Sequence, residues 1–438
     1  MTENFCVCLN PNLGVMLSRK LIKEQPDFVV ERLKIKNFDA QDIVREILKK
    51  EEEISGVRIQ VENNNAEINS VSKKIGELYK SGNREEAEAL KAKTADIKES
   101  NKSLQARLNE LEREITELIL QLPNLPHESV PAGNNEEDNE IVKENFIKHD
   151  LPSHVLPHWE LAKKYNLIDF EVGAKLTGSG FPVFMNNGAV LVRALINFFL
   201  DEAKKEGYQE YIPPYIVNEA TAFGTGQLPD KEGQMYHITQ DNFYLVPTAE
   251  VPLTNIFRDT ILTEKEVPVK LTAYTPCFRR EAGSYGKDVK GLNRVHQFDK
   301  VEIVQIVHPD KSYEVLNEMV KYVEGLLVKL GLPYRIVRLC GGDLSFTSAL
   351  TYDFEVYSPG QDKWLEVSSV SNFETFQANR LKLRIKNKDK KKVMAHTLNG
   401  SALALPRIIA AILENYQTSV GIKVPDILKD YMNMDLLK

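Results

Sequence analysis

Cysteine is scarce in this chain of 438 residues, which contains only Cys6, Cys8, Cys277 and Cys340. Only the first two lie close together, and a single Cys-x-Cys pair provides neither a zinc site nor a disulfide framework. The pattern predicts four reduced thiols, which is the usual state in the cytoplasm.

Long apolar runs are also missing. The longest, residues 188–200, is interrupted by Arg193 and Asn197 and is too short to cross a bilayer. Residues 1–15 lack the positively charged start of a secretory signal, and a better helical pattern begins only at Met16. We therefore expect a cytoplasmic protein with no membrane partner, in which residues 1–15 are an extension or precede the true start.

Positive charge is not in excess, because 56 Lys and Arg face 63 Asp and Glu and the formal net charge is −7. This balance excludes the simplest basis for binding nucleic acid, a globally basic surface. Any contact with RNA or DNA must depend on a local patch or on shape.

Proline is absent between Pro26 and Pro123, and apolar residues recur there every seven positions. The first series is Ile47, Ile54, Val61, Ile68 and Ile75, and the second is Leu90, Ile97, Leu104, Leu111 and Leu118. Such heptads predict two coiled-coil helices, and the break at Gly82 lets them pair antiparallel. The expected arm spans about residues 40–122, with helices of roughly 55 Å at ~1.5 Å per residue.

Two asparagines interrupt the apolar seam of this expected hairpin. Asn64 and Asn101 fall at the same level, so they either hydrogen-bond across the seam and fix its register or point to solvent. The arm itself could dimerise, space two bodies apart or reach a distant partner. Lys73, Lys74 and other basic residues near the turn are compatible with phosphate contact but are weak support for it.

The remainder of the chain has a different composition, richer in aromatic residues, Pro and Gly, and we place the domain boundary between residues 132 and 133. Strand-like runs occur at 209–215, 243–246, 271–278, 301–307, 334–339, 351–357 and 364–369, and helical patterns at 188–206, 249–262, 312–330 and 404–417. Because strands often follow one another directly, residues 133–438 are expected to form an α+β domain around an antiparallel sheet flanked by helices. Neither a P-loop nor a Rossmann G-x-G-x-x-G turn occurs.

The segment 275–302 is the most informative for chemistry, since it has the pattern strand, Gly-rich loop, strand. Period-two geometry places Arg279 and Glu281 on one face of the first strand, and Phe298 and Glu302 on one face of the second. An arginine can hold a phosphate with two hydrogen bonds, and a phenylalanine ring can stack on a base. A surface ladder of ion pairs with a core Phe is the alternative for any one of these residues.

A second candidate is Arg407, in the first turn of the helix predicted at 404–417. A cation at a helix N-terminus opposes the helix dipole and is unfavourable unless it faces an anion. Arg407 is therefore a candidate phosphate ligand, and a chance exposed arginine is the alternative.

These segments resemble motifs 2 and 3 of the class II aminoacyl-tRNA synthetases, at about residues 271–307 and 396–417, and residues 188–215 resemble motif 1. The closer resemblance is to the seryl-tRNA synthetases and covers residues 16–438. It rests on the segments 124–131, 248–250, 278–302, 366–372 and 397–401, together with the helical hairpin before them.

The resemblance implies an ATP-dependent ligase that activates L-serine and transfers it to serine tRNA, and selenocysteine tRNA is a further possible acceptor. It implies a homodimer crossed by the tRNA, with the arm reaching the tRNA's long variable arm. Arg279 and Arg407 would be catalytic, and Mg²⁺ would be held by Glu366 and Ser369. The implied ATP-binding residues are Arg279, Arg280, Glu281, Val295, Phe298, Glu366, Val367, Ser368, Ser369 and Arg407. The implied L-serine residues are Thr248, Ala249, Glu250, Arg279, Glu302, Asn399 and Ser401.

Four departures from the family pattern do not remove a candidate ligand: Arg280, whose side chain should point away, Val370, Ala402 and the segment 340–343. Two other functions compete. A paralogue that charges a carrier protein would lack the long hairpin, and a non-catalytic scaffold would have lost Arg279, Glu302, Glu366 or Arg407, all of which are present. The basic tract at 380–392 is either a strand end with a solvated loop or a surface near the tRNA acceptor stem.

Overall fold

The computed structural model describes residues 17–147, 149–281 and 290–438. The expectations for residues 1–15, including Cys6 and Cys8, and for the loop at 282–289 lie outside these ranges. The chain divides into two units. The first comprises the residues up to Lys34 and Phe38–Pro123, and the second comprises Ile35–Asn37 and Asn124–Lys438.

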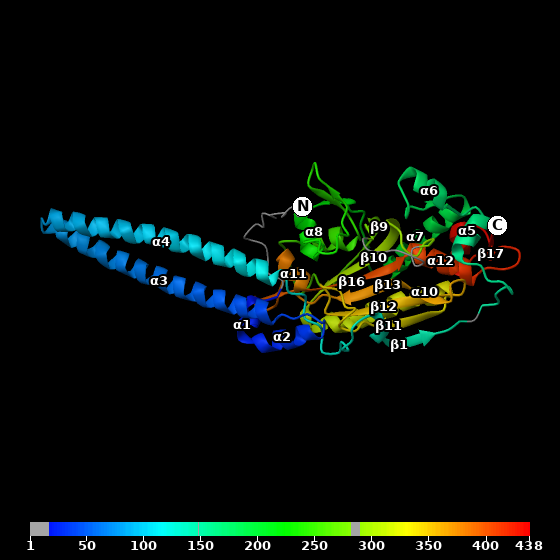
Figure 1. Ribbon diagram of the computed structural model, residues 1–438, viewed down its shortest axis with the longest axis horizontal. Coiled ribbons are helices and arrows are strands. Elements are labelled where there is room, and N and C mark those ends of the chain that lie inside the picture. The colour runs from blue at the N-terminus through cyan, green and yellow to red at the C-terminus, as the bar shows by residue number, and fades with distance from the viewer. Residues whose placement is uncertain (1–16, 148, 282–289) are drawn as a thin grey trace. The chain divides into compact units, whose positions relative to one another are not determined.

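The first unit is helical, and most of it is a long antiparallel hairpin (Figure 1). Its helices are α1 (Arg19–Glu24), α2 (Pro26–Lys34), α3 (Gln41–Lys80) and α4 (Arg84–Ile119). The predicted seam is buried at Ile47, Ile54, Leu111 and Ile115. Gly82 adopts a φ of +83° between α3 and α4, a conformation that glycine permits at low cost. The predicted helical arm is confirmed.

The seam asparagines pair across the hairpin. Asn64 Nδ2 donates to Asn101 Oδ1 at 2.8 Å, and Asn101 Nδ2 donates to Asn65 Oδ1 at 2.9 Å. The amides of Asn64, Asn101 and Asn65 are therefore linked at one level of the seam, and this pairing favours a single register over its neighbours.

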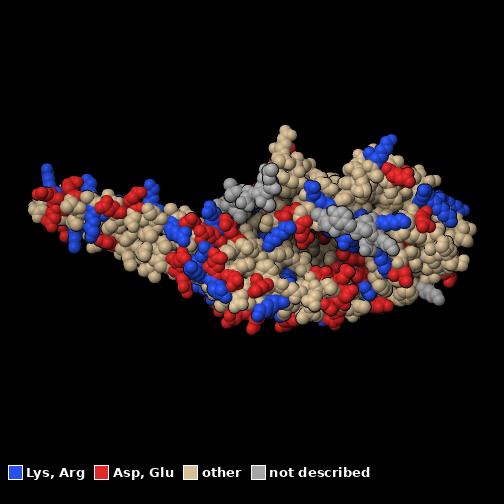
Figure 2. All heavy atoms as spheres, in the orientation of Figure 1, with Lys and Arg blue, Asp and Glu red and all other residues tan. Residues whose placement is uncertain are grey.

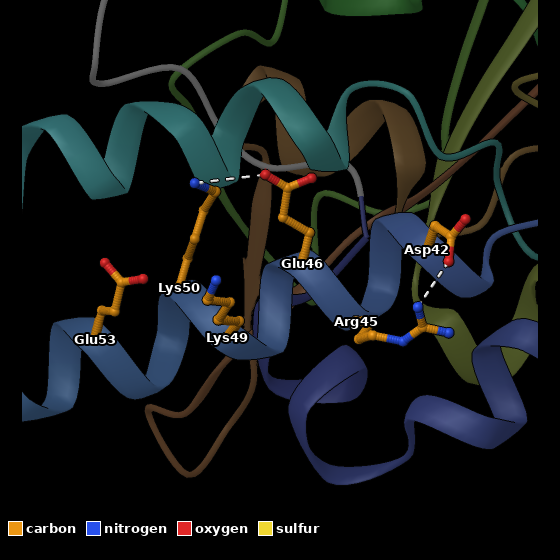
Figure 3. Close-up of a pocket in the computed structure, with 6 residues that line it drawn as sticks. All are labelled: Asp42, Arg45, Glu46, Lys49, Lys50 and Glu53. Atoms are coloured by element: carbon orange, nitrogen blue, oxygen red, sulfur yellow. Dashed lines mark hydrogen bonds and ion pairs between the residues drawn. The ribbon is translucent and has the colours of Figure 1, made fainter.

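The outer face of the hairpin carries interspersed acidic and basic side chains (Figure 2). Many are paired between the helices, as in Lys50–Glu114 at 2.7 Å and Arg107–Glu53 at 3.0 Å. A hollow of about 340 Å³ near the start of α3 is lined by six charged residues of both signs, with Arg45 turned to Asp42 and Lys50 to Glu46 (Figure 3). Mixed charges already paired in this way mark a solvated face rather than a ligand site.

The second unit is built on a sheet with strand order β1-β11-β12-β13-β16-β10-β9-β4. Its strands are β1 (Glu140–Asn145), β4 (Gln209–Glu210), β9 (Val269–Phe278), β10 (Gln297–Val307), β11 (Tyr334–Arg338), β12 (Leu350–Ser358), β13 (Lys363–Asn372) and β16 (His396–Ala404). All these pairings are antiparallel except β4 with β9. The expected α+β fold around an antiparallel sheet is confirmed.

Helices and smaller sheets surround this sheet (Figure 1). The helices are α5 (His158–Lys164), α6 (Phe170–Leu176), α7 (Asn187–Lys205), α8 (Glu219–Thr225), α9 (Glu250–Asn255), α10 (Ser312–Leu330), α11 (Phe376–Leu381), α12 (Leu405–Asn415) and α13 (Lys429–Met432). The short strands are β2 (Ile168–Asp169), β3 (Val183–Phe184), β5 (Ile216–Asn218), β6 (His237–Ile238), β7 (Phe243–Leu245), β8 (Ile261–Thr263), β14 (Arg384–Lys386), β15 (Lys392–Met394), β17 (Ile422–Lys423) and β18 (Leu436–Leu437). Among the described residues, no helix is long and apolar enough to cross a membrane.

The two faces of the sheet differ in what covers them. Val301 and Ile303 of β10 belong to the large core that α7, α10 and α12 close. Ala273 of β9 and Val304 of β10 instead pack against α9. Since side chains alternate along a strand, the even-numbered residues of β10 lie on the face away from the three long helices.

Two element predictions were wrong in their bounds. The helix expected at 249–262 ends at Asn255, and residues 261–263 form β8. The strand expected at 209–215 ends at Glu210, because Pro213 and Pro214 have no N–H to extend the ladder.

Candidate active site

The face of the sheet away from the long helices gathers most of the predicted residues. Strand register places Glu302 of β10 opposite Ser401 of β16, and Ser371 of β13 opposite Asn399. Ser369 lies two residues before Ser371 and therefore shares its face, opposite Asp353 of β12. Residues from four neighbouring strands thus converge on one surface.

A β-bulge is required to bring Glu366 and Ser369 to the same side. Residues three apart on a regular strand point to opposite faces. Here Glu355 pairs with Glu366 while Phe354 pairs with Ser368, so Val367 is the extra residue and the alternation is shifted by one. The two predicted metal ligands consequently lie on one face.

A second bulge lies on β16, where Ser401 pairs with Glu302 but Ala404 pairs with Lys300. Leu403 within it has a φ of +78°, which is unusual for a residue with a branched side chain. The bulge ends pairing just before α12 begins at Leu405. The bulge therefore helps to determine where the chain leaves the sheet and where α12 begins, with Arg407 as its third residue.

One end of the face is a buried polar network around Glu302, which is 1% exposed. Lys300 Nζ lies 2.5 Å from Glu302 Oε2, and Thr248 Oγ1 donates to the same oxygen at 3.0 Å. The Thr248 hydroxyl also accepts from the backbone N–H of Glu250 at 3.2 Å. This network fixes the side chains that the sequence assigns to the amino-acid substrate.

A second buried carboxylate, that of Glu250, belongs to the same end. Burial and the nearby Glu302 charge raise the pKa of Glu250 to about 7, against the opposing effects of a hydrogen bond from Gln377 and of Lys300 and Arg279. The buried lysine pairs with Glu302 and not with Glu250, so a substrate ammonium group could pair with the Glu250 carboxylate.

The Arg279 guanidinium lies next to this pocket. Its Nε donates to the carbonyl oxygen of Pro247 at 3.4 Å, and the group lies 5.4 Å from the centre of the Phe298 ring. A cation and an aromatic face are therefore adjacent where β9 ends and β10 begins. This is the pair that sequence reasoning assigned to a phosphate and a base.

At the other end of the face, Arg407 lies next to the carboxylate of Glu366. An anion is expected there, because a cation at a helix N-terminus opposes the helix dipole. Arg407 Nη1 donates to the Glu366 carbonyl oxygen at 2.7 Å and lies 3.4 Å from Glu366 Oε2, while its Nε donates to the Asn293 carbonyl oxygen at 3.0 Å. The Ser369 hydroxyl donates to the carboxylate of Asp353. Burial and the Glu366 charge raise the pKa of Asp353 well above its usual range, so this end also favours a cation.

The remaining predicted residues occupy less direct positions. Ala249, Val295, Val367 and Ser368 are buried, and the Ser368 hydroxyl donates to the Ser401 carbonyl oxygen at 2.7 Å, so it points into the sheet. Glu281 pairs with Arg294 at 3.1 Å. The Arg280 guanidinium lies over the Tyr236 ring, 5.4 Å from its centre.

Sequence reasoning did not assign three residues that the structure places in these networks: Lys300, Asp353 and Gln377. Strand alternation is a signal for the first two, because it puts Lys300 on the same face as Phe298 and Glu302 and puts a charged residue, Asp353, within a predicted strand. Gln377 gives no such signal, because its role depends on the packing of α11 against β16.

A fully buried histidine–glutamate pair supports the Arg407 end. His158 Nδ1 lies 2.8 Å from Glu414 Oε1, and His158 Nε2 accepts the N–H of Leu292 at 2.9 Å, so the ring is neutral with its proton on Nδ1. Gln361 contacts Glu414 and accepts from Asn293 Nδ2 at 2.7 Å. The backbone that receives Arg407 is thereby tied to the core.

A neighbouring glycine is required by this packing. Gly291 has a φ of +69°, and a Cβ atom there would lie 2.2 Å from His158 Nε2. A side chain at position 291 would displace the histidine that holds Leu292.

Glu414→Gln is expected to lower the free energy of unfolding by about 2–4 kcal/mol, because an amide turns one N–H₂ group toward donors that a carboxylate accepts. Those donors include the N–H groups of His158 and Gly360 and the Ser358 hydroxyl. Urea unfolding measures the loss, with exposed Glu318→Gln of α10 as the matched control. Equal stability of the two variants would contradict this role.

The comparisons with known proteins agree with the geometry. The sequence profile of the tRNA synthetase class II core domain (G, H, P, S and T) matches residues 236–416, and that of the seryl-tRNA synthetase N-terminal domain matches residues 16–126. The serine–tRNA ligase of Salinibacter ruber is 47% identical over 418 residues, covering 95% of this chain and 98% of its own. That of a Hydrogenobaculum species is 46% identical, covering 95% and 99%.

Solved structures show the same likeness. Seryl-tRNA synthetase from Pyrococcus horikoshii, in complex with ATP, superposes with a TM-score of 0.92 at 34% identity and covers 96% of this chain and 99% of its own. The cytoplasmic serine–tRNA ligase of Naegleria fowleri, in complex with AMP, has a TM-score of 0.88 at 25% identity and covers 97% and 99%.

The antiparallel sheet and the polar face it carries define a class II aminoacyl-tRNA synthetase. The helical arm is present, and the chain is 47% identical to a serine–tRNA ligase over 95% of its length, so it belongs to the seryl-tRNA synthetase family. It is an ATP-dependent ligase that joins serine to tRNA.

Proposed function

We propose that the polar face of the sheet is where serine is activated, with the amino acid at the Glu302 end and ATP between Arg279 and Arg407. The observation that carries this assignment is the order of charges along the face. A buried acidic pocket lies at one end, Arg279 lies beside it, and Arg407 lies with Glu366 at the other end.

The proposed serine pocket comprises Thr248, Ala249, Glu250, Arg279, Glu302, Asn399 and Ser401. Glu302 and Ser401 are proposed to meet the hydroxyl and ammonium groups of serine. Because these polar groups are buried, alanine would leave them unpaired and be rejected, by up to about 10⁴-fold. Arg279 would hold the substrate carboxylate against the α-phosphate, so that the carboxylate oxygen attacks phosphorus in line.

The proposed ATP site comprises Arg279, Arg280, Glu281, Val295, Phe298, Glu366, Val367, Ser368, Ser369 and Arg407. Phe298 is proposed to stack on adenine, with Glu281 facing its edge. Val367 and Ser368 could contribute only backbone groups, since both side chains are buried. Arg279 and Arg407 offset the negative charge that grows as pyrophosphate leaves.

Mg²⁺ fits the donors at the Arg407 end. Glu366 and Ser369 offer oxygen ligands on one face, and the carboxylate of Asp353 accepts a hydrogen bond from Ser369 beside them. Among the described residues, no group of three or more His, Cys, Asp and Glu side chains could hold a metal ion. Two protein oxygens are usual for Mg²⁺, which retains waters and binds substrate phosphates and thereby neutralises their charge.

The remaining assignments follow from the family. The arm at residues 40–122, within the domain proposed at 1–132, would reach serine tRNA, and the catalytic domain at 133–438 would act as a cytoplasmic homodimer. Selenocysteine tRNA is a further candidate acceptor. Arg380 of the basic tract is buried and donates to the carbonyl oxygens of Phe223 and Leu228, so tRNA contact by this tract would depend on the residues after it.

ATP–pyrophosphate exchange tests the activation step without tRNA. Exchange that depends on serine supports the proposal, and a failure to exchange with any amino acid contradicts it.

A further inference from the structure

A buried chain of hydrogen bonds lies behind Glu250. Thr397 Oγ1 of β16 donates to Gln377 Oε1 of α11 at 2.8 Å, and Gln377 Nε2 donates to Glu250 Oε1 of α9 at 2.6 Å. Thr397 is 0% exposed and Gln377 is 1% exposed. Strand β16 and helix α11 are thereby linked to the carboxylate of a third element, α9.

The orientation of the Gln377 amide is determined by its partners. Its Nε2 also donates to the Thr225 carbonyl oxygen at 3.3 Å, so both N–H groups have acceptors and the oxygen has a donor. A flipped amide would turn its oxygen toward the Glu250 carboxylate and the Thr225 carbonyl. These two acceptors therefore select the orientation in which Gln377 donates to Glu250, and the Thr397 hydroxyl satisfies the amide oxygen.

Among the described residues, no basic side chain forms an ion pair with the Glu250 carboxylate. The charged groups that act on it are Glu302, Lys300 and Arg279, and Lys300 is paired with Glu302. The side chain that hydrogen-bonds Glu250 is a neutral amide. Glu250 is therefore a buried carboxylate held by a neutral donor, with its charge free to meet a cation from the substrate.

We propose that Gln377, held by a hydrogen bond from Thr397, is a positioning residue that keeps Glu250 ionised and aimed at the ammonium group of the amino-acid substrate. This inference rests on the proposed function, which puts serine in this pocket with Glu302 and Ser401, and it adds Glu250 as a partner of the ammonium group.

The pKa of Glu250 lies close to neutral pH, so small changes in its surroundings alter its ionised fraction. Burial and the Glu302 charge raise the pKa of Glu250 to about 7, and the Gln377 hydrogen bond works in the opposite direction. Without that donor the pKa would rise further, and at neutral pH most of the carboxyl would be protonated and unable to pair with an ammonium group.

Gln377→Met tests this, because it removes the donor at nearly constant length. Serine-dependent ATP–pyrophosphate exchange is measured from pH 6 to 8.5. The expected result is a KM for serine roughly 10-fold higher at pH 7, with the KM for ATP within about twofold of the unmodified chain. The defect should shrink toward pH 8.5, where Glu250 ionises without its donor. Gln240→Met, at an exposed position, is the matched control.

Thr397→Val provides a second, milder variant that retains Gln377. It should shift the KM for serine in the same direction by a smaller factor, and it decides the question if Gln377→Met does not fold. A serine KM defect that is equal at every pH, or a loss confined to kcat or to ATP, would overturn the positioning role.

A second readout separates this inference from the proposed function. If the unmodified chain shows no exchange with serine, the proposed function fails, and the role of Gln377 is then determined from stability. A carboxyl whose folded pKa is raised loses stability as pH rises from its unfolded pKa through its folded pKa. Because the pKa of Glu250 is expected to be higher in Gln377→Met, the free energy of unfolding of this variant should fall more steeply between pH 6 and 8 than that of the unmodified chain. Parallel plots of unfolding free energy against pH would overturn the role.

Discussion

Arg279→Ala is expected to reduce serine-dependent ATP–pyrophosphate exchange by about 10³-fold. The guanidinium lies beside the acidic pocket and over Phe298, where it would hold both the substrate carboxylate and the α-phosphate. A preorganised group that stabilises developing charge commonly contributes 10²–10³ in rate, and this one also positions both reactants.

The measurement is the exchange rate at saturating ATP and serine, with folding checked by thermal unfolding. Arg384→Ala is the matched control, because Arg384 is exposed on β14. A loss below tenfold in Arg279→Ala would show that this arginine is not in the reaction centre.

A shortened arm should separate the two half-reactions. Residues 68 and 97 face one another across the seam, so deleting residues 68–97 and joining Glu67 to Lys98 through a Ser-Gly-Asn turn preserves the register and the Asn64–Asn101 pair. Serine-dependent exchange should remain within about twofold, since its residues belong to the second unit. Charging of serine tRNA should fall by about 10²-fold or more, because an arm without its outer half has fewer basic residues to bind RNA phosphates.

The comparison requires both assays on the same preparation, with circular dichroism to verify the remaining helix. Arg279→Ala is the useful reference, since it should lose both activities together. If the shortened arm also loses both, the hairpin supports folding of the whole chain rather than recognition of tRNA.

The arm was predictable because its stability is local. Heptads place one apolar residue in the seam at every second turn, and Gly82 permits the reversal, so both helices and the level of Asn64 and Asn101 follow from spacing alone. The antiparallel character of the sheet was also predictable, because strands such as β12 and β13 follow one another with too few residues between them for a crossover helix.

The site was predictable only in part. Period-two spacing placed Phe298 and Glu302 on one face, but only the resemblance assigned Glu366 and Ser369 to one metal site. Regular alternation would point residues three apart to opposite faces, and the bulge at Val367 brings these two together. A bulge depends on the pairing of two strands, which no single strand reveals. The Gln377–Glu250 contact likewise depends on tertiary packing between α9 and α11.

The most direct test of the central claim is aminoacylation of serine tRNA with each amino acid in the presence of ATP. Serine alone should become attached, in an ATP-dependent reaction that is lost when the 3′-terminal ribose of the tRNA is oxidised with periodate. No charging, or charging with a different amino acid, would contradict the account.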